Sequence, residues 1–286
     1  IRVYPQKNLF SHIIGQIDDD NNGISGLEKS LDDQLKKNRD TIQLTVDKDI
    51  QFLIREELIK YNQIFRSNGS AAILMDVNNG EIISLVSIPD FDPNLRANIT
   101  DINYINRVTK GVYEFGSVFK TFTLAAAFHE GIIEPQTQFN NLEKKLKCGK
   151  NTISEYDEKI PSDLSAEQIL IRSGNIGSVR IGQSLGIEKF RKFIDKLNLI
   201  NPIKFDIEEI GVPIPFDWGK CKLATTSYGH GITTTILQLA NAYSVIVNGG
   251  YEIRSTLIKK KTYKKREKIL KNNVSKKINP ILRKIV

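Results

Sequence analysis

Two periodicities of apolar residues divide the first third of the chain into predicted strands and a helix. Apolar and polar residues alternate over residues 41–46, which predicts a β-strand. Asp47 follows and can cap a helix, and the next apolar residues keep helical spacing. These are Ile50, Leu53, Ile54, Leu58 and Tyr61. Residues 70–77 and 81–88 are rich in β-forming residues and flank Asn79 and Gly80, which predicts a hairpin.

Helical patterns are more frequent in the rest of the chain. Residues 122–128 are apolar nearly all round, which predicts a buried helix beginning after the turn residue Gly116. Further helices are predicted at 27–35, 165–171, 179–185 and 236–247, the last capped by Thr235 and ended by the glycines after Asn248. Residues 251–258 are a candidate strand.

The predicted buried helix carries a candidate nucleophile and base. Ser117 is placed near its N-terminus, where a serine oxygen can cap free N–H groups, and Lys120 follows three residues later on the same face. A serine hydroxyl needs a neighbouring base, and a lysine can be that base where a dry site lowers its pKa. The alternative is a capped helix whose lysine faces solvent, but the apolar surroundings of Lys120 favour burial.

A second polar pair lies in a turn between two predicted helices. Ser173 and Asn175 are separated by Gly174, so that a hydroxyl and a carboxamide can both point into one cleft. Ordinary turn chemistry also favours these residue types, and that interpretation stays open.

Composition narrows the classes of function. The net charge is +8, but much of the basic excess lies in residues 259–277, which we interpret as an exposed tail rather than a nucleic-acid surface. No apolar run approaches the ~20 residues that span a bilayer. Cys148 and Cys221 form no metal-like or redox-like motif, and the acidic segment 18–23 suits a solvated turn better than a calcium loop. We expect no metal and no cofactor.

Together these segments resemble the class B penicillin-binding proteins, the peptidoglycan D,D-transpeptidases. The chain has a Ser-x-x-Lys element at Ser117–Lys120 and a Ser-x-Asn element at Ser173–Asn175. Residues 228–232 and 237–243 are a longer match, and residues 211–219 look most like the septal, cell-division members from α-proteobacteria. Phe115 and Ile236 depart from the family, where proline is common, and no Lys-Thr-Gly or Lys-Ser-Gly occurs in the chain.

The resemblance implies an α/β (α+β) fold: an antiparallel sheet flanked by helices, with the nucleophile helix at its centre and the C-terminal part incomplete. Residues 1–40 would end a non-catalytic pedestal domain, and residues 41–286 would form an incomplete transpeptidase domain. Ser117 would be the nucleophile, Lys120 its base and Ser173 a proton relay, while Asn175 would bind substrate.

The same resemblance implies partners and a location. The substrate would be the D-Ala–D-Ala end of peptidoglycan stem peptides, and β-lactam antibiotics would acylate the same serine. Divisome proteins would be partners and nucleic acid would not. The protein would act on the periplasmic side of the inner membrane, with its anchor upstream of this chain.

Two other functions remain open: an inactive fragment that serves as a divisome interaction module, and a β-lactamase. In the family, the strand with Lys-Thr-Gly binds the substrate carboxylate and supplies an oxyanion donor. Because this motif does not occur in the 286-residue chain, we expect the chain to be a poor or inactive transpeptidase. A labelled penicillin separates these possibilities: stable labelling indicates a transpeptidase, turnover indicates a β-lactamase, and no labelling indicates the inactive fragment. Comparing this chain with one extended through the next coding segment tests the expected loss of activity.

Overall fold

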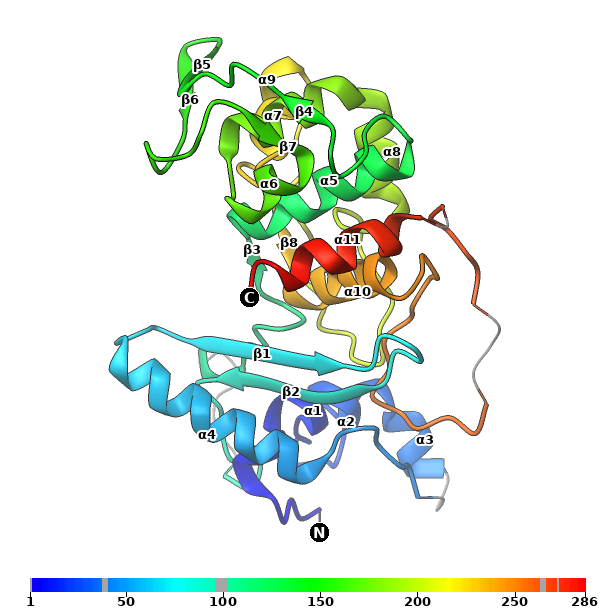
Figure 1. Cartoon of the computed structure of the whole chain (residues 1–286). Helices are drawn as coiled ribbons and strands as arrows, with labels where there is room; N and C mark the ends of the chain where they lie inside the picture. Colours follow the sequence, from blue (N-terminus) through cyan, green and yellow to red (C-terminus); the bar gives the residue numbers. More distant parts are fainter. Residues whose placement is uncertain (1, 38–40, 96–101, 263–265, 272) are drawn as a thin grey trace.

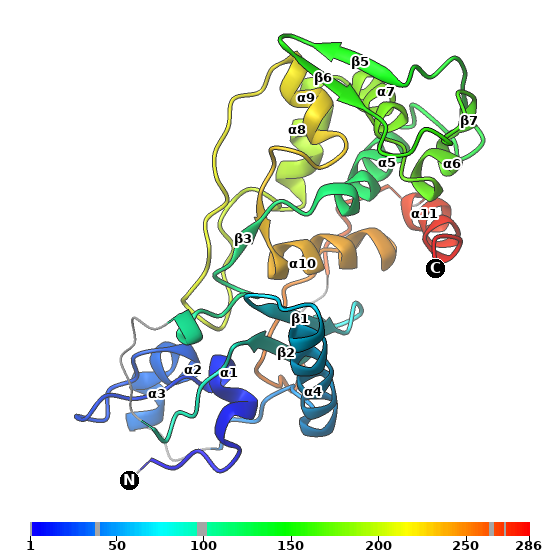
Figure 2. The ribbon, with the colours of Figure 1, turned by 90° about the vertical axis from the view of Figure 1, so that its left-hand side faces the viewer.

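The computed structural model describes residues 2–37, 41–95, 102–262, 266–271 and 273–286 (Figure 1). Two clusters of buried apolar side chains hold it together. The larger surrounds helix α5 (Lys120–His129), and the smaller joins the N-terminal helices to strand β2 (Ile82–Ile88). Figures 1 and 2 both place helix α10 (Ile236–Val247) between these two regions.

The N-terminal segment consists of short helical pieces packed under the hairpin. They are η1 (Lys7–Phe10), α1 (Ser11–Ile14), α2 (Gly26–Ser30) and α3 (Asp32–Lys37). The helix predicted at 27–35 is therefore two helices, interrupted at Leu31, which has φ −114°. The acidic segment forms a turn in which the Asp18 carboxylate accepts from the backbone N–H groups of Asp20 and Asn22. A hydrogen bond from the Asn22 carboxamide, together with these backbone hydrogen bonds, lowers the pKa of Asp18.

The predicted hairpin is confirmed. β1 (Ser70–Met75) pairs antiparallel with β2, with a register shift between Leu74 and Met75. Helix α4 (Lys48–Ile64) covers one face and α10 the other, so the sheet is flanked by helices as the fold class requires. Asp47 caps α4 by accepting from the N–H groups of Asp49 and Ile50. The predicted caps of α4 and α10 are thus both confirmed, since Thr235 accepts from the N–H of Gln238.

The inner face of α4 differs from the prediction. Its one fully buried residue is Gln51, whose amide donates to the carbonyls of Leu9 and Leu85 and accepts from the Leu85 N–H and the Ser84 hydroxyl. Leu53 and Tyr61, which the spacing predicts to be buried, are exposed. A buried polar anchor replaces the apolar stripe because the hairpin edge offers backbone groups that need partners.

The prediction of two outer strands at 41–46 and 251–258 is wrong, because neither of these two described segments forms a regular strand. Among the described residues, both segments make only isolated bridges, such as Leu44 with Ile258 and Glu81 with Thr256. The carboxylate of Asp206 accepts from the Leu257 N–H and the Thr256 hydroxyl, both at 2.7 Å. A side chain thus occupies a backbone donor that a β-ladder would use, and the pairing stops there.

The larger region is built around α5. Its other helices are η3 (Gly116–Phe119), α6 (Ala166–Ile171), α7 (Asn175–Leu185), α8 (Ile187–Lys196) and α9 (Lys220–Thr226). The short helix η2 (Ile102–Tyr104) lies instead beside the N-terminal segment, where the Asn103 carbonyl is 2.8 Å from Nε2 of His12. In the part of the chain that the structure describes, three further two-stranded antiparallel pairs join β3 (Val112–Tyr113) to β8 (Thr234–Thr235), β4 (Gln138–Phe139) to β7 (Leu164–Ser165), and β5 (Lys145–Cys148) to β6 (Asn151–Ser154). Every residue of α5 is buried, which confirms the prediction of a central helix.

The basic segment at 259–277 is only partly an exposed tail. Residues 263–265 and 272 lie outside the described residues, but Leu270, Val274 and Ser275 are buried. Leu270 precedes α11 (Val274–Arg283), which contains Val274 and Ser275 and packs against α5, α6 and α10. Its apolar positions recur at helical spacing among the basic residues, so one face is buried, while Lys276, Arg283 and the following Lys284 are exposed. In the described part of the chain, no helix is long and apolar enough to span a membrane.

Candidate active site

Lys120 is buried at the first turn of α5, with 1% of its surface exposed. Its ammonium donates to the backbone carbonyl and to the hydroxyl of Ser173, the latter at 3.0 Å. Burial lowers the pKa of Lys120 from 10.5 to about 8, and the charge of Glu155 opposes that shift. Because a pKa near neutrality lets a lysine accept a proton, the structure supplies what the predicted base needs.

Ser117 lies one turn earlier, in the 3-10 helix η3, and the residue is exposed to solvent. In the described part of the chain its hydroxyl makes no hydrogen bond, so the helix cap expected from this serine does not form. Tyr243 holds the turn in place, because its hydroxyl bonds to the Val118 carbonyl at 2.7 Å and to the Thr121 hydroxyl at 3.0 Å. Ser117 is therefore presented to solvent on a fixed backbone.

The expected contact between Ser117 and Lys120 is replaced by one between Lys120 and Ser173. No direct hydrogen bond joins Ser117 to Lys120 among the described residues, and a link through one water stays a prediction. Ser173 has φ +52°, a left-handed conformation that costs about 1–2 kcal/mol outside glycine. The strained turn between α6 and α7 thus aims the Ser173 hydroxyl and carbonyl at the lysine.

Asn175 begins α7, and its carboxamide N–H₂ donates to the carbonyl of Ser154 at 2.9 Å. The turn containing Ser173 and Asn175 lies between two helices as predicted, with α6 capped by Ser165. The structure brings Ser173 to Lys120, while the predicted substrate contact of Asn175 stays a prediction.

Glu155 is a site residue that the sequence pattern did not reveal. Its two carboxylate oxygens accept from the backbone N–H groups of Asn175 at 2.6 Å and Ile176 at 2.9 Å. It lies in a loop-rich segment, and no motif of spacing distinguishes it from its acidic neighbours. Only its position before the Ser173 turn, just after a strand, could have indicated such a role.

The loop at residues 228–231, part of the segment that resembles the family, packs directly against the serine turn. A Cβ atom added to Gly229 would lie 1.9 Å from the carbonyl oxygen of Gly116, so glycine is required at this contact. The loop is held by Lys222, whose ammonium donates to the Gly231 carbonyl, and by His230, whose Nδ1 lies 3.3 Å from the Glu114 carboxylate. This loop forms a wall beside Ser117.

Comparison with known proteins decides the family. Residues 70–286, well over half of the chain, match the transpeptidase domain of penicillin-binding proteins. The chain belongs to this family. Its fold is the family's fold, because the penicillin-binding protein 3 of Mycobacterium tuberculosis superposes with a TM-score of 0.86 at 22% identity. That comparison covers all of this chain and 69% of the other.

Two curated relatives of this penicillin-binding protein domain are about a third identical to it in sequence. The probable peptidoglycan D,D-transpeptidase FtsI of Caulobacter vibrioides is 32% identical over 91% of this chain and 44% of its own length. Stage V sporulation protein D of Bacillus subtilis is 30% identical over 96% of this chain and 48% of its own length. The chain therefore spans about half the length of these curated relatives.

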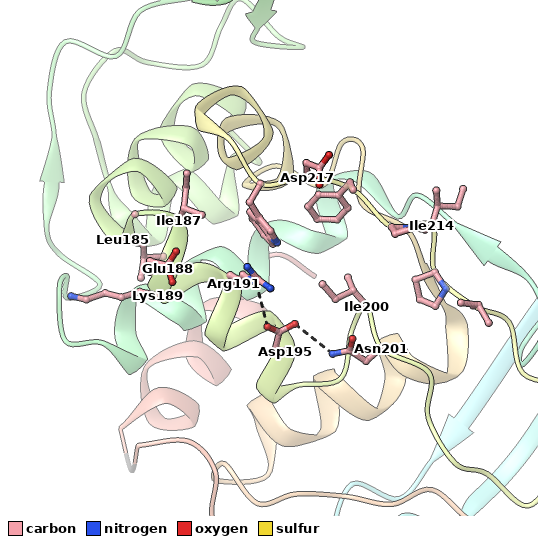
Figure 3. Close-up of a pocket in the computed structure, with 16 residues that line it drawn as sticks. Leu185, Ile187, Glu188, Lys189, Arg191, Asp195, Ile200, Asn201, Ile214 and Asp217 are labelled. Atoms are coloured by element: carbon pink, nitrogen blue, oxygen red, sulfur yellow. Dashed lines mark hydrogen bonds and ion pairs between the residues drawn. The ribbon is translucent and has the colours of Figure 1, made fainter.

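A separate cavity of about 1020 Å³ lies between α8 and the extended segment 212–218 of this penicillin-binding protein domain (Figure 3). Asp195 lines it, pairs with Arg191 and accepts from the Asn201 carboxamide, and Trp218 also contributes to its wall. None of the four predicted site residues lines this cavity. Its wall includes Phe216, and the ammonium of Lys222, which holds the 228–231 loop, lies 4.0 Å from the centre of the Phe216 ring.

The titration of Lys120 should be visible in both reactivity and stability. Below pH 8 the ammonium cannot accept a proton, so acylation of Ser117 is expected to accelerate as pH rises and to level off above about 8. In the unfolded chain Lys120 keeps its proton up to its ordinary pKa of 10.5, whereas in the folded protein it loses it near pH 8. Between pH 8 and 10.5 the unfolded chain therefore binds more protons, and the free energy of unfolding should rise with pH in this range. NMR of ¹³C-labelled lysine, assigned with Lys120→Met, measures the pKa. A midpoint near 10.5 would contradict this assignment.

Proposed function

We propose that this chain forms the acylating part of a peptidoglycan D,D-transpeptidase of the septal, cell-division type. The single observation that carries the proposal is the buried lysine with a pKa of about 8, placed one turn after an exposed serine and bonded to Ser173. Family membership supplies the reaction class, and relatives carry transpeptidase names.

The proposed reaction has two acyl transfers. Lys120 takes the proton of Ser117, directly or through the Ser173 hydroxyl, and the serine oxygen bonds to the carbonyl carbon of the penultimate D-Ala. The peptide C–N bond then breaks, the leaving amine takes the proton that Lys120 had accepted, and D-Ala departs. An amine of a neighbouring stem peptide attacks the ester and gives its proton to Lys120, which passes it to the departing Ser117 oxygen; this restores Ser117 and completes the cross-link.

Charge on the tetrahedral intermediate needs donors near Ser117. The backbone N–H of Ser117 is the proposed donor within this chain, at the positive N-terminal end of α5. Asn175 is the proposed contact for the substrate backbone. β-Lactams would acylate the same serine; solved relatives include a penicillin-binding protein 3 complexed with ampicillin.

The structure bears on the β-lactamase alternative. A lactamase needs a carboxylate or equivalent base free to activate water for deacylation. Glu155 is the carboxylate whose charge acts on Lys120, but both its oxygens accept backbone N–H groups. This arrangement favours a long-lived acyl-enzyme. A fluorescent penicillin therefore tests the function: stable labelling supports it, turnover indicates a lactamase, and no labelling indicates the divisome interaction module.

We place the protein on the periplasmic side of the inner membrane, with residues 1–40 ending a pedestal domain and divisome proteins as partners. A disulfide between Cys148 and Cys221 supports the oxidising compartment, since such bonds are rare in the cytosol. It joins β5 to α9 across 73 residues of sequence.

Removing the disulfide should destabilise the domain. Replacing both Cys148 and Cys221 by serine is expected to lower the unfolding free energy by about 2–4 kcal/mol, because the unfolded chain regains freedom. Urea unfolding with and without reductant measures this. Reductant should shift the parent protein to the midpoint of the double variant and leave the variant unchanged. A parent midpoint insensitive to reductant would contradict the prediction.

A further inference from the structure

Three consecutive residues, beginning with the last residue of strand β6, fasten the turn that carries Ser173. The carbonyl of Ser154 accepts from the Asn175 carboxamide, and Glu155 accepts from two backbone N–H groups. The hydroxyl of Tyr156 donates to the Arg172 carbonyl at 3.1 Å. The turn is thus bound on both sides of Ser173 by a segment far from it in sequence.

Glu155 supplies what the N-terminus of α7 lacks. The N-cap residue of α7 is Gly174, which has no side chain to accept the first free N–H groups. The Glu155 carboxylate takes two of them, and its negative charge lies at the positive end of the helix. A Cβ atom on Gly174 would lie 3.6 Å from Oε1 of Glu155, so the carboxylate packs closely against the turn.

The same carboxylate also acts on Lys120. Its negative charge raises the pKa of the Lys120 ammonium, which burial lowers. Two effects of one side chain therefore converge on the lysine: Glu155 fixes the turn to which the ammonium bonds, and its field helps to set the proton affinity. Because both oxygens are already hydrogen-bonded, Glu155 does not serve as a base itself.

We propose that Glu155 is a positioning residue for the acylation reaction, holding Ser173 against Lys120 through the N-terminus of α7. The proposal rests on the proposed function for its reaction, but its geometry does not depend on turnover. Nothing in the sequence motifs assigns this role, which follows from the contacts of one carboxylate with the backbone of the catalytic turn.

The test compares Glu155→Gln with Glu143→Gln. The carboxamide introduced by Glu155→Gln would keep one acceptor oxygen and turn an N–H₂ toward a backbone N–H, and it would remove the charge. Glu143 is an exposed acid that pairs with Arg180 of α7 at 3.6 Å, so its variant removes a charge near the same helix without touching the turn. Glu155→Asp keeps the charge and serves as the second variant if the glutamine variant folds poorly.

Two readouts are needed, the acylation rate with fluorescent penicillin and the Lys120 pKa by lysine NMR. Glu155→Gln is expected to lower the pKa of Lys120 and to slow acylation by roughly 10- to 100-fold, as misplaced reacting groups do. Glu143→Gln should change neither, and Glu155→Asp should keep the pKa above that of the glutamine variant.

The outcomes are distinct. An unchanged Lys120 pKa in Glu155→Gln overturns the proposal even if the acylation rate falls, because a general loosening of α7 would slow acylation without changing this pKa. Equal effects of Glu143→Gln also overturn it. If the parent protein shows no labelling that depends on Ser117, the proposed function fails. The NMR titration still decides the role of Glu155.

Discussion

Replacing Gly229 by alanine is expected to nearly abolish acylation of Ser117 and to destabilise the domain. Gly229 has φ +89°, and the added Cβ atom would lie 1.9 Å from the Gly116 carbonyl oxygen and 2.8 Å from Cβ of Phe119. The first clash is with backbone, so either the 228–231 loop or the serine turn must move. Overpacking costs about 1–3 kcal/mol. The left-handed conformation adds about 1–2 kcal/mol.

A matched control separates these two costs. Gly131 also has positive φ, +67°, but an added Cβ atom there meets nothing within 4 Å. Gly131→Ala should therefore show only the conformational cost, with acylation close to that of the parent protein. Urea unfolding and penicillin labelling measure both properties. Equal loss of labelling in the two variants would show that the contact between the loop and the serine turn is unimportant.

Replacing Lys120 by methionine is expected to slow acylation about 10²–10⁴-fold, the usual contribution of a positioned base. Methionine fills a similar volume and carries no buried charge. The lost hydrogen bonds to Ser173 leave that turn weaker by about 1–3 kcal/mol, while removal of a desolvated ammonium acts in the opposite direction. We therefore expect a large loss of reactivity with a small change in the unfolding free energy.

Lys277→Met is the control for this change. Lys277 has 15% of its side chain exposed, pairs with Glu134 at 2.6 Å and lies over the Phe128 ring of α5. It is thus a largely buried lysine against the same helix that takes no part in the proposed reaction. Labelling rates of the two variants are compared at one pH. A Lys120→Met protein as reactive as the Lys277→Met protein would contradict the role of Lys120.

Local signals in the sequence predict much of the fold. Asp47 and Thr235 identify helix starts because their side chains bond within three residues, and Asn79 with Gly80 marks the hairpin. The apolar run after Lys120 predicts the central helix and the burial of the lysine. Each of these depends on neighbours along the chain, which a single sequence displays directly.

The failures come from contacts between distant segments. Residues 251–258 do not continue a sheet because Asp206, some fifty positions earlier, bonds to the backbone N–H of Leu257. The basic segment hides the buried positions of α11, since Val274 and Ile278 are spaced among lysines whose charge dominates the pattern. No periodicity predicts such pairings.

The site shows the same division. The spacing of Ser117 and Lys120 predicts that both lie near the start of the central helix, and they lie in η3 and at the first residue of α5. The hydrogen-bond partner of Lys120 is Ser173, however, which only folding brings near. Glu155 is absent from the prediction for the same reason, because its partners are backbone N–H groups of a helix that begins twenty residues later. A carboxylate that caps another segment carries no signature in its own sequence.

The most direct test of the account is peptide mapping by mass spectrometry after prolonged reaction with excess penicillin. We expect one slow, stable adduct per chain, on the peptide that contains Ser117, and none in Ser117→Ala. The pH dependence of its formation should follow the Lys120 titration near pH 8. An adduct on another residue, or a folded protein that stays unmodified, would contradict the assignment of Ser117 as the acylated nucleophile.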